Sequence, residues 1–106
     1  MVVLKEEIWM ANFSPSIGSG INKVRPCLII SPNIHNKYMS NVIVLPLTST
    51  LKDFPSRIYC KFKNRDGQIM VDQIRTLSKI RLLKKIGTID KETNNKVYEM
   101  IKIYFK

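Results

Sequence analysis

Metal-binding and redox side chains are scarce in this sequence. It has one histidine, His35, and two cysteines, Cys27 and Cys60, which do not form a C-x-x-C pair. Structural zinc ions are usually held by four Cys or His side chains, and the whole chain has three. Both cysteines lie in apolar or strand-like segments, where buried reduced thiols are typical. We therefore predict that the protein binds no metal ion and needs no cofactor.

Acidic residues are also few, with 8 Asp and Glu against 18 Lys and Arg. The aspartates at positions 53, 66, 72 and 90 stand singly, so no cluster of carboxylates is available for Mg²⁺. A phosphate-binding glycine loop and a Ser-His-Asp nucleophile motif are missing as well. If the protein is an enzyme, its substrate must therefore supply part of the catalytic machinery.

Long apolar runs are absent. The longest, residues 27–30 and 42–47, have the length of strands, whereas a membrane-spanning helix needs about 20 residues. Lys5, Glu6 and Glu7 stand where a signal peptide would have its apolar segment. We expect a single domain of residues 1–106 in the bacterial cytoplasm.

What the sequence does have is a net charge of +10, which favours binding to polyanions and speeds their capture. An alternative is that the charge reflects AT-rich coding, because 13 of the basic residues are lysines and Ile and Asn are also abundant. The five arginines are better evidence for function, since the planar guanidinium matches the geometry of phosphate.

Short strands are predicted along most of the chain. The expected strands are residues 6–13, 24–31, 41–48, 57–62, 68–71 with an extension at 74–77, and 81–86. Loops are expected at residues 14–23, 32–40 and 49–56, with a hairpin turn at 64–67. Pro46 interrupts its strand, which predicts a sheet edge or a bulge there.

The C-terminal segment changes from strand to helix periodicity. Val97, Met100, Ile101 and Tyr104 recur at helical spacing on one face, and Asp90 is a plausible N-cap. Five to seven short strands followed by one helix predict a mainly β fold, a small barrel of SH3-like size.

RNA is a substrate that brings its own nucleophile, because the 2′-OH of a ribose can attack the neighbouring phosphate. The protein then has to position that group, move a proton and stabilise charge on phosphorus. Arg25 and Thr48 are candidates, because both lie beside loops at strand ends. Arg25 precedes Pro26, which keeps its backbone extended, and a guanidinium can bind two phosphate oxygens. From the residues alone, however, a lone arginine in a strand is usually a solvated side chain, and a threonine at a strand end is usually there because it favours strands.

A set of motifs in a fixed order gives these residues more meaning. The motifs are Ile8-Trp9, Phe13-Ser14-Pro15, Gly18-Ser19, Arg25-Pro26, Leu47-Thr48-Ser49, Asp72-Gln73-Ile74-Arg75-Thr76, Arg81-Leu82 and Lys85-Ile86-Gly87. Together they resemble the MazF/PemK toxin family. Each motif alone is weak, but the ordered set covers nearly the whole chain.

The resemblance implies a dimeric SH3-like barrel, a fold that the family shares with the gyrase poison CcdB. It implies a metal-independent endoribonuclease that cuts single-stranded RNA at short sequences and leaves a cyclic phosphate and a 5′-hydroxyl. The protein would be the toxin of a type II toxin–antitoxin system, neutralised by an antitoxin encoded beside it. An acidic, partly disordered antitoxin tail would complement the charge of +10.

The resemblance also assigns site residues. The family's catalytic arginine falls on Arg25 and its catalytic Thr or Ser on Thr48. For Arg25, stabilising charge is the better-supported role, because a guanidinium keeps its protons in proteins. Residues expected to bind RNA are Ser19, Gly20 and Lys23 of the 14–23 loop, and Asp72 and Gln73, which match positions that read bases.

Two positions depart from the family pattern. Many relatives carry an acid where this chain has Gly20, and many carry another where it has Asn12. Both changes remove negative charge near the expected RNA site and are expected to affect which sequence is cut. Asn12 is also expected to weaken proton handling if an acid at that position takes part in it.

Three alternatives remain open from the sequence. His35 is the other candidate base, because its ring can exchange a proton near neutral pH, although an exposed loop histidine is the simpler interpretation. A CcdB-like inhibitor that binds a protein and cuts nothing would use the same fold. A basic barrel that binds RNA without cutting it is the third possibility.

Overall fold

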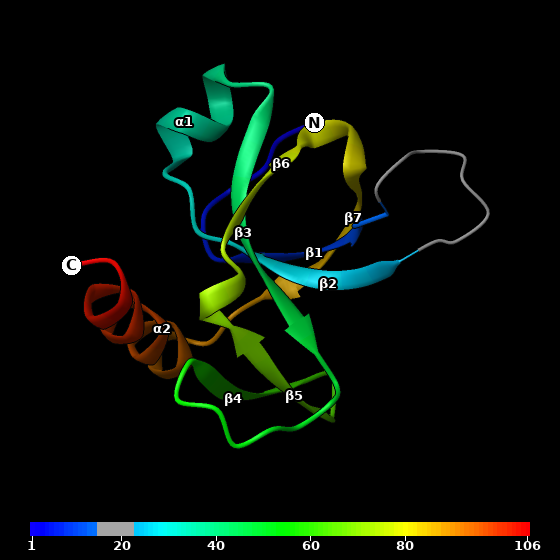
Figure 1. The fold of residues 1–106 in the computed structure, drawn as a ribbon. Helices are drawn as coiled ribbons and strands as arrows, with labels where there is room; N and C mark the ends of the chain where they lie inside the picture. Colours follow the sequence, from blue (N-terminus) through cyan, green and yellow to red (C-terminus); the bar gives the residue numbers. More distant parts are fainter. Residues whose placement is uncertain (15–22) are drawn as a thin grey trace.

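The computed structural model describes residues 1–14 and 23–106 (Figure 1). These residues form seven strands, two α-helices and two 3₁₀ turns. The strands are β1 (Glu7–Asn12), β2 (Val24–Ile29), β3 (Asn41–Thr48), β4 (Arg57–Phe62), β5 (Arg65–Met70), β6 (Arg75–Ser78) and β7 (Leu82–Thr88). The helices are α1 (Asn33–Tyr38) and α2 (Lys91–Tyr104), and the 3₁₀ turns are η1 (Val71–Gln73) and η2 (Lys79–Arg81).

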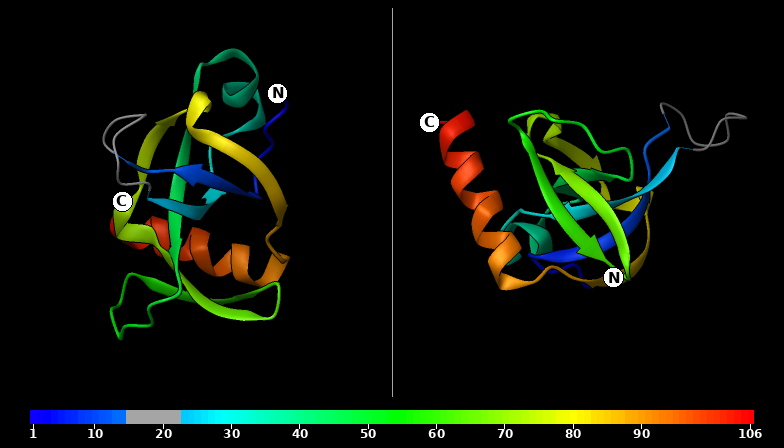
Figure 2. Two further views of the ribbon diagram at one scale, coloured as in Figure 1. Left: turned by 90° about the vertical axis from the view of Figure 1, so that its right-hand side faces the viewer. Right: turned by 90° about the horizontal axis from the view of Figure 1, so that it is seen from below.

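All seven strands belong to one antiparallel sheet, in the order β4-β5-β3-β2-β1-β7, with β6 also paired to β3. The sheet curls into a half-barrel, and α2 lies along one side of it (Figures 1 and 2). This confirms the prediction of a mainly β fold with a C-terminal helix. Within the described residues, α2 is the longest helix at 14 residues, and none is long and apolar enough to span a membrane.

Strand β3 joins the two halves of the curled sheet. Its first half, up to Val44, pairs with β6, while Leu47 and Thr48 at its end pair with β5. Pro46 lies between these two stretches and is paired with Cys27 of β2. Proline has no backbone N–H to give to a ladder, so it fits where the outer partner changes. The expected interruption at Pro46 is therefore a change of partner within one continuous strand.

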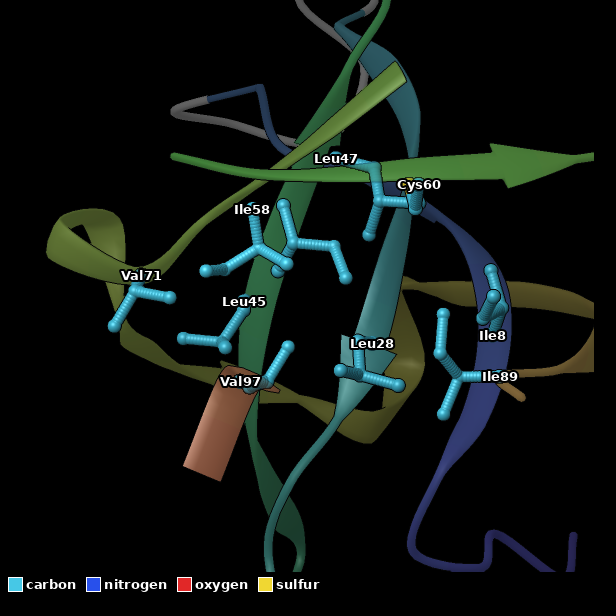
Figure 3. Packing of buried hydrophobic residues seen from close by; sticks show 10 residues of the cluster. Ile8, Leu28, Leu45, Leu47, Ile58, Cys60, Val71, Ile89 and Val97 are labelled. Carbon is cyan, nitrogen blue, oxygen red and sulfur yellow. The ribbon is translucent and has the colours of Figure 1, made fainter. Parts of the chain in front are cut away.

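Two hydrophobic clusters fill the two faces of the sheet, because successive residues of a strand point to opposite sides. In β1, Ile8 belongs to one cluster and Trp9 to the other. The first cluster faces α2, whose Val97 is fully buried and points toward Leu28 and Leu45 (Figure 3). Trp9 is 7% exposed and packs in the second cluster.

Helix α2 begins at the predicted N-cap. The carboxylate of Asp90 accepts hydrogen bonds from the backbone N–H and the hydroxyl of Thr93, both at 2.9 Å. These bonds lower the pKa of Asp90. Met100 and Ile101 join Val97 against the core, but Tyr104 is 42% exposed, because the last turn extends beyond the sheet. The predicted apolar face is thus correct except at its end.

Three local predictions were wrong. Residues 74–77 do not extend the 68–71 strand, because η1 intervenes and β6 is a separate strand paired with β3. The expected loop at residues 32–40 contains α1, which is too short for helical periodicity to show in the sequence. The hairpin turn is formed by Lys63 and Asn64 and not by residues 64–67, since Phe62 already pairs with Arg65. Lys63 and Asn64 both have positive φ, 51° and 62°, as a two-residue hairpin of type I′ requires.

Candidate functional site

Arg25 and Thr48 line the same cavity, which has a volume of about 690 Å³. Arg25 comes from β2 and Thr48 from the end of β3, so the cavity lies where the two halves of the sheet meet. Its apolar wall is formed by Met10, Phe62 and Ile86 among others. Its polar wall contains Ser49, Thr50, Lys63, Arg65, Asp66 and Gly67.

Arg25 is held by the ladder between β1 and β2. It pairs with Ala11, and the pairing continues beyond the strands to a hydrogen bond from Phe13 N–H to the Lys23 carbonyl at 2.8 Å. The following Pro26 restricts Arg25 to an extended backbone, as predicted. The side chain of Arg25 is half-buried, so part of it stays accessible to a ligand.

Thr48 is half-buried at the last position of β3. Its Oγ1 accepts a hydrogen bond from the backbone N–H of Thr50 at 3.1 Å. Within residues 1–14 and 23–106 its own O–H has no acceptor, so the hydroxyl can donate to a bound molecule. Gly67 of β5 approaches closely here, because a Cβ at that position would lie 3.1 Å from the Thr48 carbonyl oxygen.

A second cavity of about 200 Å³ adjoins the first, since Arg25 lines both. It is also lined by Phe13, Lys23, Pro46, Gln73 and Arg75. The guanidinium of Arg75 lies 5.4 Å from the centre of the Phe13 ring, a cation–π arrangement that holds it at the cavity wall. We call the two cavities together the basic groove.

The charge of the basic groove is strongly positive. Its walls contain five cations, which are Lys23, Arg25, Lys63, Arg65 and Arg75. Among the described residues that line it, Asp66 is the one carboxylate, and it accepts a hydrogen bond from the Tyr59 hydroxyl at 2.5 Å. This hydrogen bond is the main reason why the pKa of Tyr59 is raised. A groove of this charge attracts phosphates. The guanidinium of Arg25, which lines the same cavity as Thr48, has the geometry to contact two oxygens of one phosphate.

Most of the described residues predicted for the site line the groove. Arg25 and Thr48 share the larger cavity, and Lys23 and Gln73 line the smaller one. Asp72 lines neither, because its Oδ1 accepts a hydrogen bond from the Ser56 hydroxyl at 2.9 Å. Ser19 and Gly20 lie outside the described residues.

Among the groove residues that were not predicted for the site are three cations, Lys63, Arg65 and Arg75, and the aromatic Phe13. Lys63 lies in the turn of the β4–β5 hairpin and Arg65 follows the turn, and two charges at a hairpin tip were a signal that could have been used. Arg75 lies two residues after Gln73, and its contact with Phe13 joins segments far apart in the sequence. Such a contact leaves no local pattern to detect.

Asn12 and His35 have structural contacts instead of places in the groove. The side-chain oxygen of Asn12 accepts a hydrogen bond from Ser14 N–H at 2.9 Å, which shapes the exit of the chain from β1. His35 is half-buried on α1, with its Nε2 2.8 Å from the side-chain oxygen of Asn41. Asn41 begins β3 and Thr48 ends it, so His35 lies at the other end of the strand from the groove (Figure 1).

The metal-binding side chains are dispersed. Within residues 1–14 and 23–106, no three His, Cys, Asp or Glu side chains are close enough to hold a metal ion together. Cys27 and Cys60 are buried free thiols, as predicted. Burial raises the pKa of Cys27 to about 12 and that of Cys60 to about 11, so both stay protonated and unreactive at neutral pH.

Comparison with known proteins gives a consistent match over almost the whole chain. Residues 5–105 match the family described as the PemK-like, MazF-like toxin of type II toxin–antitoxin systems. The endoribonuclease EndoA of Bacillus subtilis is 34% identical over 97% of this chain and 94% of its own. The endoribonuclease MazF of Staphylococcus saprophyticus is also 34% identical, over 86% of this chain and 84% of its own.

Solved structures show the same fold. MazF from Deinococcus radiodurans superposes with a TM-score of 0.84 at 20% identity, covering 99% of this chain and 97% of its own. A mycobacterial endoribonuclease, solved in complex with its cognate antitoxin, superposes with a TM-score of 0.80 at 24% identity. That match covers 97% of this chain and 94% of the mycobacterial one.

Proposed function

This chain belongs to the PemK-like, MazF-like toxin family, and we propose that it is a toxin endoribonuclease that cuts single-stranded RNA without a metal ion. The observation that carries the proposal is that Arg25 and Thr48 line the same cavity of the basic groove. The two relatives at 34% identity are both named endoribonucleases, which supports the same activity here.

The reaction uses the substrate's own nucleophile. The 2′-OH gives up its proton as its oxygen attacks the adjacent phosphorus, the bond from phosphorus to the 5′-oxygen breaks, and the departing 5′-oxygen takes up a proton. The products are a 2′,3′-cyclic phosphate and a 5′-hydroxyl. Charge builds up on the non-bridging phosphate oxygens in the transition state, so fixed donors aimed at those oxygens accelerate the reaction.

Arg25 and Thr48 are suited to be those donors. The guanidinium of Arg25 offers two N–H groups in a plane that matches two phosphate oxygens, and its charge opposes the charge that develops. Thr48 Oγ1 already accepts from Thr50 N–H, so its O–H is directed toward another acceptor. That acceptor would be a non-bridging oxygen, or Thr48 would orient the 2′-OH.

The rest of the groove binds the RNA on either side of the cut. Lys23 and Arg75 neutralise flanking phosphates, and Gln73 has the amide needed to read a base edge in the smaller cavity. Ser19 and Gly20 are proposed to contact the RNA backbone from the loop that contains them. Asp72 is proposed to act on recognition indirectly, through its bond to Ser56 of the β3–β4 connection.

Two features of the surface support the proposed partners, namely the charge of the basic groove and the exposed apolar side chains near the C-terminus. An antitoxin with an acidic, partly disordered tail would fill the basic groove, and the mycobacterial relative solved with its cognate antitoxin supports such a partner. A homodimer is proposed because apolar side chains in the last turn of α2 and just after it are exposed, Ile103 at 70% and Phe105 at 51%. The proposed place of action is the bacterial cytoplasm, where mRNA is available.

The test is cleavage of a long single-stranded RNA in the presence of EDTA, with the new 5′ ends mapped and their hydroxyl groups identified. Arg25→Ala should slow cleavage about 100-fold or more, because one charge-stabilising donor is removed. Lys37→Ala removes an equal charge from α1, away from the groove, and should leave the rate unchanged. Intact RNA that still binds in a salt-dependent way would favour a non-catalytic RNA-binding barrel. Intact RNA without binding would favour a CcdB-like inhibitor.

A further inference from the structure

The side-chain amide of Gln68 forms hydrogen bonds with both backbone groups of Lys52. Its Nε2 donates to the Lys52 carbonyl at 2.9 Å, and its Oε1 accepts from the Lys52 N–H at 3.0 Å. The same Oε1 also lies 3.4 Å from a guanidinium nitrogen of Arg57. One half-buried side chain thus anchors a connection that has no regular secondary structure between β3 and β4.

Gln68 is also the direct partner of Thr48 in the ladder between β3 and β5. Residues opposite each other in an antiparallel pair point to the same face, so the Gln68 side chain stands beside that of Thr48. The five residues 48–52 therefore form a small loop closed at both ends by Gln68. Within that loop, Thr50 N–H donates to Thr48 Oγ1.

Few other contacts hold this loop. Residues 49–55 are all exposed, and the next anchors are the hydrogen bonds from Arg57 N–H to Phe54 and from Ser56 to Asp72. Among the described residues, the Gln68 amide is thus the clamp nearest to Thr50. Exposed backbone hydrogen bonds in such a segment open readily unless a side chain closes them.

We infer that Gln68 is a positioning residue for cleavage, which acts by holding Thr50 N–H against Thr48 Oγ1 so that the Thr48 hydroxyl proton points into the groove. Gln68 itself does not line either cavity, so it acts through the loop. The inference rests on the proposed role of Thr48. It adds a residue from β5 that reaches the reaction without touching the substrate.

The test compares Gln68→Met with Gln68→Glu. Methionine keeps the length of the side chain and loses both hydrogen bonds to Lys52, whereas glutamate keeps the acceptor for Lys52 N–H. We expect kcat to fall about 10-fold in Gln68→Met, with KM within about twofold of the unchanged protein, because a misplaced group affects the chemical step. Gln68→Glu should recover part of the lost kcat.

A double-mutant cycle separates positioning from general stabilisation. If Gln68 acts through Thr48, then Gln68→Met should cause no further loss of single-turnover rate in a Thr48→Ala background. Amide hydrogen exchange supplies a readout besides activity. The Lys52 and Thr50 amides should exchange faster in Gln68→Met, while the Ile58 amide in the β4–β5 ladder keeps its protection and shows that the fold is intact.

Several results would overturn the inference. An unchanged kcat in Gln68→Met, an effect on KM alone, or an equal loss of rate in the Thr48→Ala background would each do so while leaving the proposed function standing. If the unchanged protein does not cut RNA at all, the proposed function fails, and the positioning role fails with it. Unaltered exchange at Lys52 and Thr50 would show that the clamp does not hold the loop.

Discussion

The ring of Phe62 occupies the space that a side chain at Gly87 would need. A Cβ at position 87 would lie 2.6 Å from Cζ and 2.7 Å from Cε1 of the ring, far inside normal contact distance. Phe62 and Ile86, the neighbour of Gly87, both line the larger cavity of the groove. Gly87 of β7 therefore determines where the Phe62 ring lies at the edge of the larger cavity.

Gly87→Ala should displace the Phe62 ring and change the shape of the cavity. Overpacking costs about 1–3 kcal/mol in the free energy of unfolding, and we expect about 1 kcal/mol, because the tip of the ring can swing away. RNA cleavage should fall more than this loss of stability explains. Urea denaturation and cleavage rates measure the two effects. In a Phe62→Leu background the cost of Gly87→Ala should vanish, and a cost that persists would contradict the steric cause.

Glu7 should make folding stability sensitive to acid. It is 5% exposed, accepts hydrogen bonds from Leu4 N–H at 2.8 Å and Trp9 Nε1 at 3.1 Å, and pairs with Lys85 at 2.8 Å. Burial raises the pKa of Glu7, but the bonds from Lys85, Leu4 and Trp9 together outweigh burial and leave it below the usual 4.5. The folded state thus gains stability from the ionised form above pH 4.5, and loses it as the pH falls through the lower folded value.

Glu7→Gln removes this acid-sensitive stabilisation. At pH 7 the substitution should lower the free energy of unfolding by about 1–3 kcal/mol, the value of hydrogen bonds to a charged group. Below pH 4.5 the difference in free energy of unfolding between the variant and the unchanged protein should close. Urea denaturation across pH 7 to 3 measures it. Lys85→Met leaves the buried Glu7 carboxylate without its cation, so this variant should begin to lose stability at a higher pH than the unchanged protein. A gap between Glu7→Gln and the unchanged protein that is constant with pH would contradict this account.

Gln73 and Asp72 should affect recognition differently although they are adjacent. Gln73 lines the groove, so Gln73→Ala should relax the preference for one base by roughly 10- to 100-fold, the value of a good hydrogen-bonded base contact. Asp72→Asn keeps an acceptor for the Ser56 hydroxyl, so it should leave the cut sequence unchanged. Sequencing of all 5′ ends from a mixed RNA pool measures both. A new cut sequence in Asp72→Asn would mean that this side chain contacts the base directly.

Binding of RNA should depend strongly on salt. Each phosphate neutralised by a groove cation contributes about −0.7 to the slope of log affinity against log salt concentration. Arg75→Gln removes one such cation without touching the pair formed by Arg25 and Thr48, so the slope should become shallower by about that amount. Fluorescence anisotropy with a short uncleavable RNA at several salt concentrations gives the slope. An unchanged slope would place Arg75 outside the RNA path.

Local sequence patterns predicted the parts of the fold that depend on interactions between residues close together in the sequence. Alternation located the strands, helical spacing located α2, and Asp90 marked its start. The turn at Lys63 and Asn64 was missed because Asp66-Gly67 is the stronger turn signal, whereas Gly67 is needed in β5 beside the Thr48 carbonyl.

The candidate site depended on more than local pattern. Its central pair came from the resemblance, since nothing in the spacing of Arg25 and Thr48 says that they meet. The bond of Ser56 to Asp72 and the contact of Arg75 with Phe13 join distant segments, so only the folded chain displays them.

The completion of the sheet and the core by the last two elements, β7 and α2, has a consequence during synthesis. Arg25 and Thr48 leave the ribosome early, but β7 pairs with β1 along its length, and Val97 of α2 completes the core against Leu28 and Leu45. Both of these elements are made last. A nascent chain therefore carries Arg25 and Thr48 before β7 and α2 have completed the sheet and the core around them. Under the proposed function, the message that encodes the chain would be spared until translation has finished.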